Sequence, residues 1–157
     1  MHFIVDNQTY IMEDDDFYEK MSSKYATKDV DFIIKRGAKL LFVEAKSSSP
    51  KKLDKYVDEL YIKFLDSLII FTGILLERKK TESTIITKEL KDIKHLKGDI
   101  QLIVIIKNAQ KIHLLPIRDS LNKRLRKLKI MFSLENDVIV INEQQAISKG
   151  FLKEIIT

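Results

Sequence analysis

Asp31, Glu44 and Lys46 are charged residues set among strongly apolar neighbours. Asp31 precedes the apolar residues 32–34, and Glu44 and Lys46 follow the apolar residues 40–43. Ionised groups in such surroundings cost free energy unless they are paired or bound to a metal ion. A salt bridge between Lys46 and one acid is the structural interpretation. Two acids with one lysine leave a spare negative charge, which a divalent cation can neutralise, and this is the chemical interpretation.

Two strands joined by a tight turn are predicted to position these side chains. The strands are predicted over residues 30–35 and 40–46. Gly37 lies between them and accepts the positive φ of a tight turn. If the turn closes at residues 37–38, Asp31 pairs near Glu44, and Glu44 and Lys46 point to one side because alternate strand residues share a face. We therefore expect the three groups to converge in a surface-accessible cleft.

The remaining sequence predicts helices and strands in alternation. Helices are predicted over residues 14–25, 51–78, 87–95, 120–129 and 147–156. Further strands are predicted over residues 3–5, 10–12, 100–107 and 138–141, the first two as a small hairpin, with an exposed loop over 79–84. This order predicts an α/β fold, a three-layer sandwich with a central mixed β-sheet flanked by helices. No linker or repeat divides residues 1–157, so a single domain is expected.

The composition excludes several kinds of function. The chain has 157 residues, no cysteine, three histidines far apart and four glycines. A disulfide framework, a cysteine zinc site and a glycine-rich phosphate loop are therefore excluded. Hydrophobic residues make up 45% and charged residues 32%, which is typical of a folded globular chain. The chain opens without a signal-peptide pattern, and the apolar residues 60–76 include Lys63 and Asp66, so a cytoplasmic protein is expected.

The charges are distributed unevenly along the chain. The net charge is +5, yet residues 1–31 carry eight acids against three lysines, and residues 107–129 carry eight lysines and arginines against Asp119 alone. A nucleic-acid enzyme needs acids to hold a cation and bases to hold phosphates, although a generally lysine-rich composition would also produce this pattern. The predicted phosphate-binding residues on the basic helix are Lys123, Arg124, Arg126 and Lys127. An ordinary solvated helix face is the alternative for them.

These residues resemble a known nuclease family. Asp31 on one predicted strand and Glu44-Ala45-Lys46 on the next match the motif of the PD-(D/E)xK nuclease superfamily, which has the restriction-endonuclease-like fold. The resemblance covers residues 14–78, including the helix before Asp31 and the long helix after Lys46. Val30 stands where the motif has its proline.

The resemblance implies a role for each motif residue. Asp31 and Glu44 would be carboxylate ligands of Mg²⁺ or Mn²⁺, and the backbone carbonyl of Ala45 would complete the ligands from the protein. Mg²⁺ prefers oxygen ligands and keeps several waters, which suits two carboxylates and a substrate phosphate. Lys46 would position the attacking water or offset negative charge at the scissile phosphate, because lysine is a compact charge that does not compete as a metal ligand.

The expected activity is therefore metal-dependent hydrolysis of phosphodiester bonds, with DNA as the expected substrate and a homodimer or a larger assembly as the expected form. The alternative is a catalytically silent or partner-dependent subunit that binds nucleic acid within a larger assembly, such as a defence system. Lys63 could contact a phosphate or pair with Asp66, three residues further along the same helix. Glu19 could supply a further acid or lie on the solvated surface.

Overall fold

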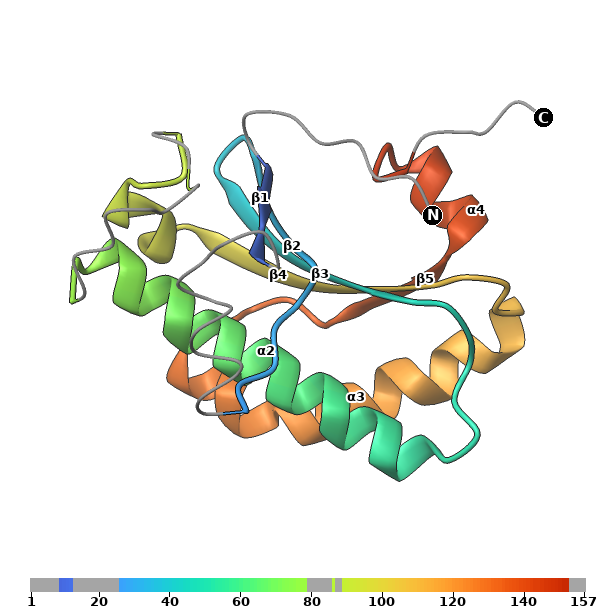
Figure 1. The fold of residues 1–157 in the computed structure, drawn as a ribbon. Helices are drawn as coiled ribbons and strands as arrows, with labels where there is room; N and C mark the ends of the chain where they lie inside the picture. The colour runs from blue at the N-terminus through green and yellow to red at the C-terminus, as the bar shows by residue number, and fades with distance from the viewer. Residues whose placement is uncertain (1–8, 13–25, 79–85, 87–88, 153–157) are drawn as a thin grey trace.

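The computed structural model describes residues 9–12, 26–78, 86 and 89–152 (Figure 1). The predicted strand 3–5, the helix 14–25 with Glu19, and the loop 79–84 lie outside these residues. The strands are β1 Thr9–Ile11, β2 Phe32–Arg36, β3 Lys39–Lys46, β4 Asp99–Ile106 and β5 Ile139–Asn142. The helices are α2 Leu53–Leu75, α3 Lys111–Met131 and α4 Glu143–Ser148, with a 3₁₀ helix, η2, at Ile93–Lys97.

The five strands form one mixed sheet in the order β1-β2-β3-β4-β5. The pairs β1–β2 and β2–β3 are antiparallel, whereas β3–β4 and β4–β5 are parallel. Helices α2 and α3 cover one face and α4 lies against the other (Figure 1). The two parallel connections cross over through α2 and α3, and a shared right-handed crossover places both helices on the same face. The predicted α/β fold with a mixed sheet flanked by helices is confirmed at this level.

The hairpin of β2 and β3 has the predicted register. Phe32 pairs with Val43, so Asp31, one residue before β2, comes opposite Glu44 when the register is extended by one residue. Gly37 has φ of 59° and occupies the turn, as the sequence predicts. Positive φ at the first central residue is what a two-residue hairpin turn requires, and only glycine adopts it without strain. The turn therefore determines which residues face each other across the strands.

Helix α2 packs through an apolar stripe onto the sheet. Leu60, Phe64 and Leu68 are fully buried within it. Phe71 meets Phe42 of β3 edge to face, with ring centroids 5.8 Å apart. This contact anchors the C-terminal half of α2 on the same strand that carries Glu44.

Helix α3 begins earlier than the predicted residue 120. It starts at Lys111 and contains Pro116 in its second turn. A proline there lacks the N–H that would bond to the carbonyl of Ile112, and both residues are exposed, so water can serve that carbonyl. Leu114 and Ile117 extend the buried stripe toward the start of the helix, which offsets the loss.

Two other predicted helices differ from the structure. The described part of residues 87–95 forms no α-helix. Its last three residues belong instead to the 3₁₀ helix η2, Ile93–Lys97, none of whose residues is buried to stabilise a longer helix. The last predicted helix, residues 147–156, is wrong over residues 149–152. Helix α4 ends at Ser148, and Gly150 has a left-handed φ of 70° that stops the helix. The predicted strand 10–12 is observed as β1, Thr9–Ile11, which pairs with β2 within the sheet.

Candidate active site

The hairpin brings Asp31, Glu44 and Lys46 together at the end of β3. Asp31 Oδ2 accepts a hydrogen bond of 2.6 Å from the backbone N–H of Ala45. Lys46 Nζ lies 3.0 Å from Glu44 Oε1. Asp31 is also close enough for its negative charge to act on Glu44. The carboxylates and the ammonium of the sequence motif therefore share one face of the sheet, the face covered by α2.

Helix α2 anchors the segment that leads into Asp31. Ser67, which is fully buried, accepts a hydrogen bond of 2.8 Å from the backbone N–H of Val30. Asp66 Oδ2 accepts one of 2.9 Å from the N–H of Lys28. These two bonds hold the chain along α2 just before the hairpin, so the position of Asp31 depends on the helix as well as on the strands.

Two further side chains from α2 enter the site. Lys63 Nζ lies 2.8 Å from Glu44 Oε1, and Glu59 Oε1 accepts a hydrogen bond of 2.6 Å from Lys46 Nζ. Asp66, the alternative partner of Lys63, is engaged by the backbone of Lys28. The sequence analysis missed Glu59. A signal exists, because Glu59 and Lys63 are four residues apart on the helix face that borders the apolar stripe.

Glu44 is a buried carboxyl group surrounded by charges. Only 1% of its side chain is exposed, and its Oε2 atom is buried with no hydrogen-bond partner. Burial raises the pKa of Glu44 to about 7, the negative charge of Asp31 adds to this, and Lys63 and Lys46 oppose it. A buried oxygen without a partner costs free energy. The sequence predicted an accessible cleft, whereas Glu44 is covered by its neighbours.

Lys46 and Glu59 form the more exposed half of the cluster. Burial acts to lower the pKa of Lys46, but the hydrogen bond to Glu59 and the charge of Glu44 raise it above its ordinary value. The same hydrogen bond lowers the pKa of Glu59. Both groups are therefore held in their charged forms, and Lys46 is fixed between two carboxylates.

A shallow depression opens beside Glu59. It is lined by Pro50, Lys51, Lys52, Lys55, Tyr56 and Glu59. The Tyr56 hydroxyl is buried without a hydrogen-bond partner, and burial, followed by the negative charges of Glu44 and Glu59, raises its pKa. Because Glu59 contacts Lys46 directly, this lysine-lined depression is adjacent to the charged cluster.

The residues present fit a divalent cation held by two carboxylates. Glu44 Oε2 is an orphaned oxygen, and Asp31 lies beside Glu44. Within the described ranges, no group of three or more acidic, histidine or cysteine side chains could hold a metal ion. Two carboxylates are sufficient for Mg²⁺, which retains waters and takes further ligands from backbone carbonyls and phosphate. Ala45, the predicted carbonyl ligand, lies between the motif residues on β3, in register with Ile105 of β4.

The basic helix α3 contacts α2 on the other side from the cluster. Arg124 Nε lies 2.7 Å from Asp58 Oδ1, and its guanidinium lies over the Tyr61 ring at 4.2 Å. Tyr61 and Lys63 are two residues apart and point to opposite sides of the helix. Arg124 therefore serves as a tie between helices. Lys123, Arg126 and Lys127 are exposed.

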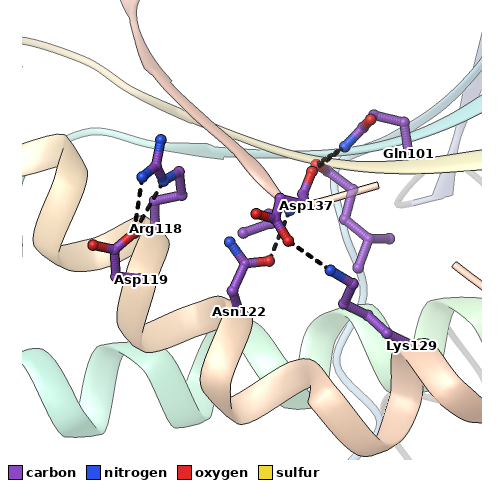
Figure 2. A network of polar contacts seen from close by, with 8 residues as sticks. Gln101, Arg118, Asp119, Asn122, Lys129 and Asp137 are labelled. Carbon is purple, nitrogen blue, oxygen red and sulfur yellow. Dashed lines mark hydrogen bonds and ion pairs between the residues drawn. The ribbon is translucent and has the colours of Figure 1, made fainter. Parts of the chain in front are cut away.

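Side chains also connect the C-terminal half of α3 to residues 137–138, directly before β5 (Figure 2). Lys129 Nζ lies 2.7 Å from Asp137 Oδ1, and Asn122 Oδ1 accepts a hydrogen bond of 3.0 Å from the N–H of Val138. Gln101 of β4 donates to the carbonyl of Asp137 at 2.7 Å. Lys129 thus has a structural partner, and the exposed positive charge of this helix is carried by the residues before it.

Comparisons with known proteins identify no relative of this chain. No protein-family model matches it, no curated protein matches it, and no solved structure matches it. None of the helices in the described residues is long and apolar enough to cross a membrane. The functional interpretation therefore rests on the geometry of the site.

Proposed function

We propose that this chain is a metal-dependent nuclease with a restriction-endonuclease-like fold, which hydrolyses phosphodiester bonds in DNA. One observation carries the proposal. Glu44 is a buried carboxylate with an unpartnered oxygen, and it lies beside Asp31 and within 3.0 Å of the ammonium of Lys46. A strand without function has no need of such a costly cluster, whereas a cation site next to a phosphate does.

The chain's own residues divide the chemistry between them. Asp31 and Glu44 would hold Mg²⁺ or Mn²⁺, with the Ala45 carbonyl as a further ligand, and the ion would supply a water of lowered pKa and stabilise charge on the phosphate. Lys46, fixed by Glu59 at 2.6 Å, would orient the attacking water or offset the charge that develops at the phosphate. Its raised pKa keeps it charged, which favours the second of these roles.

Phosphates outside the reacting bond would be held by lysine and arginine side chains. The exposed α3 residues Lys123, Arg126 and Lys127 remain candidates, and Arg124 is a weaker one because it is bound to Asp58. The lysines of the depression share it with Glu59, which contacts Lys46 directly. Contacts of this kind give affinity without sequence information.

A second candidate is a catalytically silent or partner-dependent subunit that binds nucleic acid. The observation that favours it is the closed ion-pair network, in which Lys46 and Lys63 already neutralise Glu44. Such a cluster could be maintained without a metal ion. Metal binding and cleavage by the isolated chain distinguish the two candidates.

The test is incubation of the purified chain with plasmid and linear DNA in Mg²⁺, Mn²⁺ or EDTA. We expect cleavage with a metal ion, none in EDTA, and none in Asp31→Asn or Glu44→Gln. Asp54→Asn is the matched control, because Asp54 is an exposed acid in the first turn of α2. Metal and DNA binding without cleavage would favour the second candidate. A chain that neither binds metal nor cleaves would refute the nuclease proposal.

A further inference from the structure

Two ammonium groups converge on the same oxygen of Glu44. Lys63 Nζ lies 2.8 Å from Oε1 and Lys46 Nζ lies 3.0 Å from it. Lys46 has a second carboxylate, Glu59, at 2.6 Å. Among the described residues, Glu44 is the one acid within ion-pair distance of Lys63. The two lysines are thus held differently, one by two acids and the other by Glu44 alone.

A divalent ion at this carboxylate would meet the positive charge of Lys63 at close range. Like charges a few ångströms apart repel strongly in a buried site. Lys46 keeps Glu59 as its partner if it loses contact with Glu44. Lys63 has a flexible four-carbon stem, and its side chain is 18% exposed, so its ammonium can turn toward solvent. Lys63 is therefore the group whose ammonium can move away from Glu44.

We propose that Lys63 is the resident counter-cation of Glu44 and competes with the divalent ion for that carboxylate. In the metal-free chain it neutralises a charge that is almost fully buried. When the ion binds, the Lys63 ammonium leaves Glu44 while Lys46 stays on Glu59. Lys63 thereby sets the metal affinity of the site. This inference rests on the proposed function, because it concerns the same cation site.

The first test measures Mg²⁺ affinity by isothermal titration calorimetry on the full chain without nucleic acid. At pH 8.5 protons compete little for Glu44. We expect Lys63→Met to bind Mg²⁺ about tenfold more tightly than the wild type, which corresponds to about 1.4 kcal/mol. Lys63→Arg keeps the charge and is expected to stay near the wild type. Lys97→Met is the matched control, because it removes an exposed lysine charge from η2, outside the cluster.

The second test uses the wild-type chain, so it does not depend on a variant that folds. With ¹⁵N-labelled lysine, the ammonium signal of Lys63 is expected to change as Mg²⁺ saturates the site, and that of Lys46 to persist. An unchanged Lys63 signal, or a Lys63→Met affinity no higher than that of Lys97→Met, would overturn the inference. If the wild type still bound Mg²⁺, the proposed function would remain intact. Absence of Mg²⁺ binding in both the wild type and Lys63→Met would overturn both.

Discussion

Replacing Glu44 with glutamine is expected to remove most of a pH dependence of folding stability. Burial, and then the charge of Asp31, raise the pKa of Glu44 from 4.5 to about 7. The folded chain therefore binds this proton more tightly than the unfolded chain, and stability falls as the pH rises from about 4.5 through 7. This difference in pKa corresponds to about 3 kcal/mol of unfolding free energy. At 1% exposure, solvent screens the effect little.

The measurement is urea denaturation in EDTA at several pH values between 5 and 8. The difference in unfolding free energy between the wild type and Glu44→Gln is expected to change by about 2–3 kcal/mol over this range, because part of the effect falls below pH 5, and the wild type loses stability toward pH 8. Glu135→Gln, at an exposed position, is the control and should differ from the wild type by the same amount at every pH. Parallel curves for the wild type and Glu44→Gln would refute the buried, proton-binding Glu44.

Three other predictions concern residues around Glu44 and on α3. Lys46→Ala should slow single-turnover cleavage at least about a hundredfold, which is the scale of one lost electrostatic contact in a transition state. Filter binding should show little change in DNA affinity. Cleavage at the wild-type rate would exclude a role for Lys46 in the reaction. The double variant Lys123→Glu, Lys127→Glu should reduce the salt slope of DNA binding by roughly one for each lost phosphate contact. The cleavage rate of bound DNA should stay unchanged. An unaltered slope would show that α3 does not contact the DNA. Ser67→Ala should lower the free energy of unfolding by about 1–3 kcal/mol in thermal denaturation, because it leaves the buried N–H of Val30 without a partner. It should also weaken Mn²⁺ binding, because Val30 precedes Asp31. A loss of stability with unchanged Mn²⁺ affinity would show that this hydrogen bond does not position the site.

The hairpin that carries the motif could be predicted because its determinants are local. Gly37 supplies the positive φ of the turn, and the strand period of two assigns each residue to a face. Both faces of β3 are buried, with Leu40 and Phe42 on one side and Leu41 and Val43 on the other. A slip by one residue would exchange these two sets and carry Glu44 to the face away from α2. Once Phe32 pairs with Val43, the neighbourhood of Asp31 and Glu44 follows.

Helix ends were less predictable because they depend on packing. Leu114 and Ile117 are buried and extend α3 past Pro116, which a local pattern weighs as a helix breaker. Residues 93–97 have no buried member, so nothing stabilises a longer helix there. Near the C-terminus, Gly150 has a left-handed backbone conformation, and helix α4 ends before it.

The sequence alone determined that two acids and a lysine would meet on one face of β2 and β3, but tertiary structure decided what surrounds them. Glu59 and Lys63 reach Lys46 and Glu44 because of how α2 is rotated about its axis. That rotation is set by the packing of the buried α2 stripe on the sheet, which involves residues far apart in sequence. The same packing turns Tyr61 toward α3 and away from Glu44, so the charged cluster around Glu44 and the basic helix α3 lie on opposite sides of α2.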